Sequence, residues 1–464
     1  MDIFTPVVPE EKQHKHFRFI TQTNLYTPEI SVINGWADSF IDRDGKFAKE
    51  FQTTFNSSFW ELYLFACFKE LNCKVDLFHE TPDFVISSPY GDFIAEATTA
   101  NHPEGFRPEW DQDLSMLDQI SMDDMLRLST IRLLNAITSK HRKYVTKYSK
   151  LAHVHNKPFV ICVAPFEQPF FFFQNAEPIV RVLYAYEQPL IVPSGKEGQF
   201  IIIGESRSHR VQKKPGVDLS LGLFTNSAMS EVSAIIFNNK ATLSKVHALA
   251  ENCTYPVIFS GSRVVNSGKE LGVEHFVKRK PNYKETLLDG VQILLNPFAK
   301  YPLDMRIFEN KEVAVHDYDP QTEDYLSEFP NGFLLQRMCL SIISQDTVLE
   351  FKQSMSNKSY QELPAETWEE NELVYVGGQN GWWRDNHIAH YRGWTAVVSF
   401  DSNDEDWSSL AVDSLCYNIP QFMKANDNQS IASTAALGCF STKEEAYSAI
   451  KRKIDQLYDQ NDNI

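Results

Sequence analysis

Three carboxylates between residues 61 and 96 have the types and spacing needed to bind a metal ion. Glu96 stands between two alanines in the apolar segment FIAEAT, and Asp83 opens another apolar segment, DFVIS. Burying an ionised carboxylate costs several kcal/mol unless it is paired or bound to a metal. Asp83 and Glu96 on neighbouring strands, with Glu61 from a helix, would form an oxygen-rich site suited to Mg²⁺ or Mn²⁺.

Residues 81–100 predict the hairpin that would bring two of these acids together. Two runs rich in apolar and β-branched residues flank the turn sequence SPYGD. Alternation along the second strand puts Thr98 on the same face as Glu96. Asp83 then lies on the adjacent strand near the same end, and Glu61, in the first turn of the preceding helix, reaches that end of the sheet.

The elements around the hairpin predict an α/β fold. A buried helix is expected at NSSFWELYLFACFKELN before the hairpin, and a long helix from about 113 to 151 after it. Buried strands are expected at 157–166 and 232–239, followed by helices at EPIVRVLYAY and KATLSKVHALA. A strand at FIII and a polar, basic loop at SRSHRVQKKPG lie between them. This order favours a mixed sheet flanked by helices.

Changes in composition divide the chain into four parts. Residues 1–50 show weak periodicity and are expected to be an N-terminal extension of strands or loops. Residues 51–300 hold the α/β elements, and residues 301–365 form a connector that is helical through FLLQRMCLSIISQD. Residues 366–464 change to short strands and a final helix that opens with the capping sequence Ser441-x-x-Glu444, which is typical of a small α+β accessory domain.

The net charge of −17 is unevenly distributed along the 464 residues. Residues 301–464 contain 27 acidic and 12 basic residues, whereas the first 300 contain 34 acidic and 32 basic residues. The first 300 residues can therefore carry a basic face, so net charge alone excludes no nucleic-acid partner. The acidic C-terminal region would repel duplex DNA, which favours a protein partner or a regulatory role for it.

The seven cysteines are scattered without a CxxC pair and are expected to be reduced core thiols. No apolar run approaches the roughly 18 residues needed to span a bilayer, and the first residues lack the apolar core of a secretory signal. We therefore expect a cytoplasmic protein with no membrane contact.

The order of these elements resembles the PD-(D/E)xK nuclease superfamily. The matching residues are Glu61 in FWELYL, Pro82 and Asp83 in TPDF, and Glu96 in AEAT. The resemblance covers roughly residues 50 to 240 and implies a restriction-endonuclease-like mixed sheet flanked by helices. It also implies hydrolysis of nucleic-acid phosphodiester bonds, with DNA as the expected substrate, in restriction or anti-phage defence.

Thr98 occupies the position of the family's lysine, which is the main departure from the pattern. Members of the superfamily are known to relocate this lysine to the following helix, where this chain offers Lys140, Lys143 and Lys147. Lys140 is the first choice because it lies three residues after Ile137, at the edge of the apolar stripe that should face the sheet.

The resemblance assigns a role to each residue. Asp83 and Glu96 would hold Mg²⁺ or Mn²⁺, which acidifies a bound water. Glu61 would orient that water, and Lys140 would assist the nucleophile or stabilise charge on the phosphate. Six further cations would contact the nucleic-acid backbone: Lys143, Lys147, Arg207, Arg210, Lys213 and Lys214.

Each acid and lysine also has a structural interpretation. Glu61 fits a Ser58-x-x-Glu61 capping box, and Asp83 suits a turn at a strand entry. Glu96 could belong to a structural ion pair, and Lys140 could be a solvated surface residue. Without a lysine at position 98, the chain could also be a catalytically inactive platform that binds nucleic acid or protein.

The C-terminal segment GGQNGWWRDNHIAHYRGW is the other conspicuous cluster. His387 and His390 are three residues apart, so on a strand they point to opposite faces and suit a metal poorly. Trp382, Trp383, Trp394 and Arg392 are interpreted as core residues or as a recognition surface for a partner.

Overall fold

The computed structural model places most of the chain in two compact units. It describes residues 1–112, 121–187, 190–193, 200–203, 207–253, 257–266, 271–280, 282–309, 311–341, 369–372, 383–391, 394–401, 406–413, 435–442, 444–445, 447–449 and 451–452. Unit 1 comprises 1–253, 262–274 and 284–338, and unit 2 comprises 254–261, 275–283 and 339–464.

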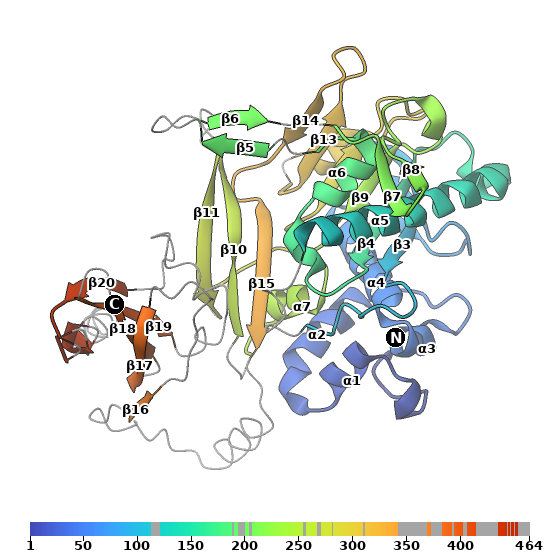
Figure 1. Ribbon diagram of the computed structural model, residues 1–464. Helices are drawn as coiled ribbons and strands as arrows, with labels where there is room; N and C mark the ends of the chain where they lie inside the picture. The colour runs from blue at the N-terminus through green and yellow to red at the C-terminus, as the bar shows by residue number, and fades with distance from the viewer. Residues whose placement is uncertain are drawn as a thin grey trace. The chain divides into compact units, whose positions relative to one another are not determined.

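Unit 1 is built on an eight-stranded mixed sheet (Figure 1). Its strands, in spatial order, are β1 (Lys74–Asp76), β2 (Phe84–Ser88), β3 (Gly91–Asn101), β4 (Phe159–Phe166), β9 (Ala234–Phe237), β12 (Gln292–Leu295), β13 (Ala314–Tyr318) and β14 (Tyr325–Glu328). Strands β3, β4 and β9 are parallel, and β2 and β12 run antiparallel to their neighbours β3 and β9.

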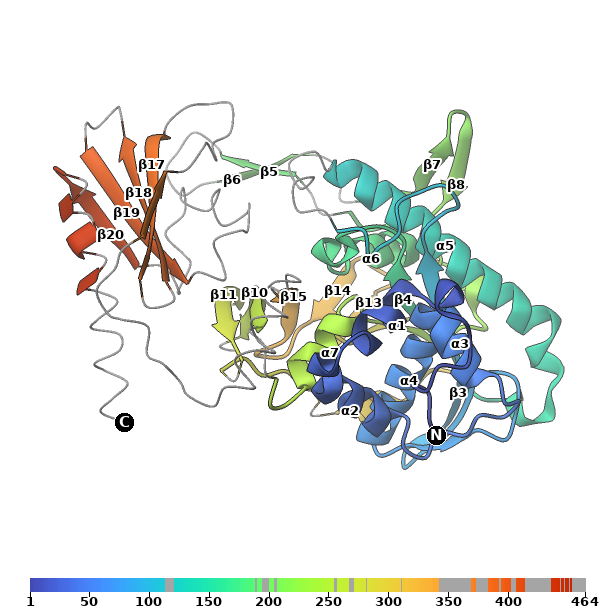
Figure 2. The same ribbon diagram turned by 90° about the horizontal axis from the view of Figure 1, so that it is seen from below.

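Seven helices belong to the described part of unit 1. They are α1 (Lys15–Thr21), α2 (Thr27–Trp36), α3 (Phe47–Thr53), α4 (Phe55–Glu70), α5 (Met122–Thr146), α6 (Glu177–Tyr184) and α7 (Leu243–Leu249). Figure 2 shows the sheet between α5 and α6 on one side and α4 on the other. The predicted α/β class, with a mixed sheet flanked by helices, is confirmed.

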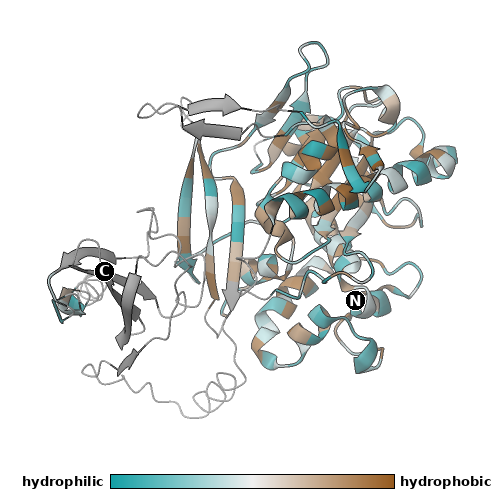
Figure 3. Cartoon of the chain, viewed as in Figure 1, coloured by the Kyte–Doolittle hydropathy of each residue, from teal (hydrophilic) through white to brown (hydrophobic). Residues whose placement is uncertain are grey.

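Alternation along β3 decides which helix each side chain meets. Ile94 belongs to the same buried cluster as Ile137 of α5, whereas the Phe93 ring contacts the Phe68 ring of α4. All eight residues of β4 are buried, as expected for a strand covered on both faces. Figure 3 shows hydrophobic residues concentrated in these central strands. Glu96, two residues after Ile94, therefore faces α5.

Three expectations about local structure are wrong. Residues 1–50 form helices α1 and α2 and the start of α3, because buried aromatic rings such as Phe17 pack on Phe51, and Trp36 packs on Phe59 of α4. The segment FLLQRMCLSIISQD begins as strand β15 (Leu334–Ser341) rather than as a helix. The basic segment after residue 207 is a hairpin of β7 (Arg210–Lys214) and β8 (Val217–Ser220), not a loop.

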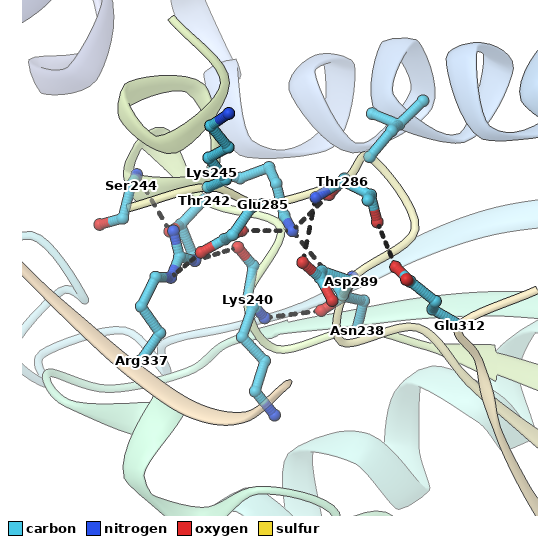
Figure 4. Close-up of polar contacts among 12 residues, drawn as sticks. Asn238, Lys240, Thr242, Ser244, Lys245, Glu285, Thr286, Asp289, Glu312 and Arg337 are labelled. Atoms are coloured by element: carbon cyan, nitrogen blue, oxygen red, sulfur yellow. Dashed lines mark hydrogen bonds and ion pairs between the residues drawn. The ribbon is translucent and has the colours of Figure 1, made fainter. Parts of the chain in front are cut away.

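A buried ion network lies just beyond the end of β9 (Figure 4). The Lys245 ammonium pairs with Glu285 and donates to the Asp289 carbonyl at 2.9 Å. Arg337 Nε lies 3.2 Å from the other oxygen of Glu285, and Arg263 pairs with the Asp289 carboxylate. These contacts connect α7, the segment after residue 284 and the strands that carry Arg263 and Arg337 through buried, paired charges.

The described strands outside the large sheet form smaller sheets. Strands β5 (Leu190–Pro193) and β6 (Phe200–Ile203) form a two-stranded pair, and β11 (Leu271–Arg279), β10 (Val257–Asn266) and β15 form a three-stranded sheet. Unit 2 contains an antiparallel sheet of β16 (Glu369–Glu372), β17 (Trp383–Tyr391), β18 (Trp394–Asp401), β19 (Asp406–Asp413) and β20 (Ala435–Phe440).

Parts of the C-terminal predictions can be followed in unit 2. His387 and His390 both lie on strand β17, as expected, while Trp382 and Arg392 lie outside the described residues. The final helix is helical at its described positions, and its cap is Thr442, whose hydroxyl accepts from the Glu445 amide at 3.2 Å. The cap is therefore one residue later than the predicted Ser441.

Helix α5 should depend on its sheet-facing stripe for stability. Ile137 is fully buried and Val145, on the same helix, is 44% exposed. We expect Ile137→Ala to lower the free energy of unfolding by about 2 to 5 kcal/mol, because it leaves a cavity against the sheet. Val145→Ala should change it by less than about 0.5 kcal/mol. Urea denaturation followed by circular dichroism measures both, and equal effects would contradict the assigned faces.

Candidate active site

Asp83 and Glu96 interlock across strands β2 and β3. Phe84 pairs with Ala95, so Asp83, one residue earlier, lies opposite Glu96. The Asp83 amide donates to Glu96 Oε2 at 3.3 Å, and the Ala97 amide donates to Asp83 Oδ2 at 2.7 Å. The sequence interpretation that placed these two acids side by side therefore agrees with the geometry.

Glu96 is fully buried, and helix α5 supplies its counter-charges. Its Oε1 accepts hydrogen bonds from Lys140 Nζ at 2.7 Å, Lys143 Nζ at 2.9 Å and the Tyr148 hydroxyl at 2.9 Å. Burial acts to raise the pKa of Glu96, but the two ammonium groups outweigh it and hold the pKa below its ordinary value. Glu96 is thus an ionised carboxylate inside the fold.

Lys140 and Lys143 reach Glu96 because they flank the buried stripe of α5. Ile137 and Tyr144 of this stripe pack in the core beside the sheet. The side chains of Lys140 and Lys143 are 21% and 37% exposed. Long lysine side chains of this kind bury their aliphatic stems along apolar surface, and here the ammonium groups contact the carboxylate. Lys140 is therefore not a solvated surface residue. The ion pair that a purely structural Glu96 would need is also present.

Glu61 approaches from α4 and is held by an arginine. Its Oε1 lies 3.8 Å from Arg43 Nη2, and Arg43 Nη1 donates to the carbonyl oxygens of His79 and, at 3.5 Å, Asp83. Burial, followed by the charge of Asp83, raises the pKa of Glu61 to about 8. Arg43 offsets part of this shift, so Glu61 shares one electrostatic environment with Asp83.

Glu61 is not a helix cap, and it lies in the second turn of α4 rather than the first. Helix α4 already begins at Phe55, and Ser58 is buried within it. The residue before the helix, Thr54, makes no side-chain cap. The capping-box interpretation of Ser58 and Glu61 is therefore wrong.

The surroundings of Asp83 favour its protonated form, because nearby negative charge and burial outweigh the groups that stabilise its carboxylate. Burial and the charge of Glu96 raise its pKa to about 6, although Lys140 and the Ala97 amide act in the opposite direction. The interpretation of Asp83 as only a turn residue does not explain why it lies so near Glu96 and influences Glu61. Two of the three carboxyls thus bind protons more strongly than free carboxyls do, a deficit of positive charge that a cation would relieve.

These acids fit a divalent cation in charge and in donor type, since Mg²⁺ prefers carboxylate oxygens. Their spacing in this structure, however, is too wide for a metal site. Within the part of the chain that the structure describes, no group of three or more His, Cys, Asp or Glu side chains stands close enough together to hold a metal ion. Glu96 directs Oε1 to the two lysines and Tyr148, whereas its Oε2 accepts the Asp83 amide at 3.3 Å and keeps a lone pair that a cation could use.

The remaining predicted cations lie away from the three acids. Lys147 is exposed at the C-cap of α5, and Arg207 pairs with Glu323 at 3.3 Å. The other three are exposed on strand β7, which packs beside α5 (Figure 2): Arg210, Lys213 and Lys214. The structure therefore brings Lys140 and Lys143 to the acids and leaves this group on the surface.

Two residues of the site were missed by sequence reasoning. Tyr148 has the spacing of an apolar position after the long helix, and nothing in that spacing indicates that its hydroxyl bonds to a carboxylate. Arg43 precedes α3 in a polar segment, and its contact with Glu61 depends on how the N-terminal helices pack. The need of a buried acid for a paired cation was the signal that could have prompted a search for Arg43.

A search of protein-family models, curated proteins and solved structures finds no match to this chain. Among the described residues, no helix has the length and apolar character needed to cross a membrane.

The raised pKa of Glu61 should make the metal-free protein less stable as pH rises. The pKa increases from 4.5 when unfolded to about 8 when folded, so the folded state binds more protons between these values and loses stability across them. We expect Glu61→Gln to reduce this loss between about pH 5 and about pH 8. The effect should be modest, because Glu61 keeps 21% of its exposure.

Urea denaturation at several pH values, with EDTA present, measures this difference. Glu104→Gln, which changes an exposed residue, is the matched control and should leave the pH dependence of wild type intact. An unchanged slope in Glu61→Gln would show that Glu61 is already solvated and paired.

Proposed function

We propose that this chain is a metal-dependent nuclease with a restriction-endonuclease-like core, which hydrolyses phosphodiester bonds of nucleic acid, with DNA as the expected substrate. The observation that supports this most directly is the meeting of Asp83 and Glu96 with two lysine ammonium groups from the next helix. A lysine is absent at position 98, and α5 supplies the charge from elsewhere. By resemblance, the setting would be restriction or anti-phage defence.

The residues of the site divide into acids that bind and cations that stabilise. Asp83 and Glu96 would hold Mg²⁺ or Mn²⁺, which when bound polarises the phosphate and acidifies a water. Glu61, which pairs with Arg43 at 3.8 Å, would orient a water near the same acids. A lysine ammonium group from α5, where Lys140 and Lys143 now donate to Glu96, would stabilise the negative charge that grows on the phosphate oxygens during hydrolysis.

Exposed cations on β7 and at the end of α5 favour an anionic polymer as the substrate. Arg210, Lys213 and Lys214 lie on β7, which packs beside α5, and Lys147 is exposed at the end of α5. Regularly spaced phosphates bind such groups with release of counterions, whatever the base sequence. The acidic C-terminal region would not bind duplex DNA, so we assign it a protein partner or a regulatory role.

The second candidate is a platform that binds nucleic acid or protein without cleaving it. It is favoured by one observation: Lys140 and Lys143 both pair with Glu96 and neutralise its charge. The two functions differ in whether the acids are needed for hydrolysis, and the following experiment separates them.

Asp83→Asn and Glu96→Gln should each abolish Mg²⁺-dependent cleavage. Loss of a metal ligand removes several kcal/mol of transition-state stabilisation, which corresponds to at least about a thousandfold in rate. Cleavage of plasmid DNA and of RNA by purified wild type and variants, with and without EDTA, is the measurement. The control is Glu104→Gln, an exposed acid that should retain full activity. Absence of cleavage by wild type, with binding retained, would establish the platform instead.

The hairpin cations should contribute to nucleic-acid affinity rather than to chemistry. For the double variant Lys213→Gln and Lys214→Gln we expect weaker DNA binding and a salt dependence reduced by about one unit of slope per lysine. Fluorescence anisotropy across a salt series measures both. Lys12→Gln with Lys49→Gln removes the same charge from exposed positions on other elements and serves as the control. Equal effects of the two pairs would mean that net charge, and not the hairpin, determines affinity.

A further inference from the structure

The Oε1 atom of Glu96 accepts more hydrogen bonds than its lone pairs require. Lys140, Lys143 and Tyr148 all donate to it, at 2.7, 2.9 and 2.9 Å. A carboxylate has about four acceptor sites over its two oxygens, so two donors saturate one oxygen. One of the three contacts can therefore be given up while Glu96 stays hydrogen-bonded.

Burial identifies which donor is free to leave. Tyr148 is 2% exposed and belongs to the core cluster under α5. The Lys140 side chain is 21% exposed, whereas that of Lys143 is 37% exposed and has the most direct access to solvent. Moving Lys143 outward exposes little apolar surface, while moving Tyr148 would open the core.

The surroundings of Lys143 point the same way. It lies in the last turn of α5, close to the exposed end of the helix, and moving it outward costs only the cation–π contact of its Nζ with the Tyr148 ring, 4.9 Å from the ring centre. Lys147, one turn later on the same face, is exposed, as are Arg142 and Lys150 nearby in the chain. An anionic substrate that approaches the exposed basic side chains at this end of α5 would meet Lys143 before the less exposed Lys140.

We propose that Lys143 is the catalytic lysine, which exchanges its contact with Glu96 for a contact with the substrate phosphate, while Lys140 and Tyr148 remain on Glu96 as positioning residues. This inference rests on the proposed function and names the residue that replaces the lysine missing at position 98. It also differs from the choice of Lys140 made from helix periodicity. The exchange moves hydrogen bonds only, and no covalent bond is made or broken in it.

Amine labelling of the full chain tests the exchange directly. The protein is treated with an acetylating reagent without metal, with Mn²⁺, and with Mn²⁺ plus a short phosphorothioate DNA duplex, and each lysine is quantified by mass spectrometry. We expect Mn²⁺ to increase labelling of Lys143 relative to Lys140, and DNA to reduce it again. A response of Lys140 instead, or of neither lysine, would overturn the proposal.

Matched variants test the same assignment by rate. Lys143→Met should lower kcat by about a hundredfold with little change in KM, as expected for a donor that acts on developing charge, and Lys143→Arg should restore part of it. A larger loss of kcat in Lys140→Met than in Lys143→Met would contradict the assignment. If labelling of Lys143 follows Mn²⁺ and DNA but wild type cleaves nothing, the exchange stands and the proposed hydrolysis fails.

Discussion

A negative charge buried in the middle of a sheet is the constraint around which this molecule is arranged. Glu96 has no exposed surface, and an unpaired carboxylate there would oppose folding. Two ammonium groups and a phenol satisfy it, and all three come from α5 and the short turn that follows. The helix must therefore pack on the face of β3 that carries Glu96. Its C-terminal part, with the turn after it, carries all three donors.

The same charge connects the candidate chemistry to the fold. Asp83 and Glu61 lie near Glu96 and are pushed toward their protonated forms, whereas Glu96 is held ionised. Acids with such different tendencies inside one site are typical of places where protons or cations are exchanged. A structural ion pair alone would need Glu96 and one lysine, so the two extra acids and the second lysine are what favour a functional interpretation.

Much of this arrangement could be predicted because it depends on local pattern. Alternation and a turn sequence place Asp83 opposite Glu96, and helical spacing places Lys140 beside the sheet. The failures have a common cause in contacts between distant segments. The Tyr148 hydroxyl contacts Glu96, and the Arg43 guanidinium contacts Glu61, only because distant segments pack together. Likewise, residues 334–341 form a strand because a partner, β10, is present, while the spacing of their apolar residues would also suit a helix.

Arg43 makes the first fifty residues part of the candidate site. This guanidinium touches Glu61 and the two carbonyls that frame the turn before Asp83, so it acts as a brace between the helical N-terminal segment and the acids. A shortened chain designed to begin at residue 51 would keep every carboxylate and both lysines yet lose that brace. The smallest folded unit able to form this site therefore starts before Arg43, and the N-terminal helical segment is part of the site.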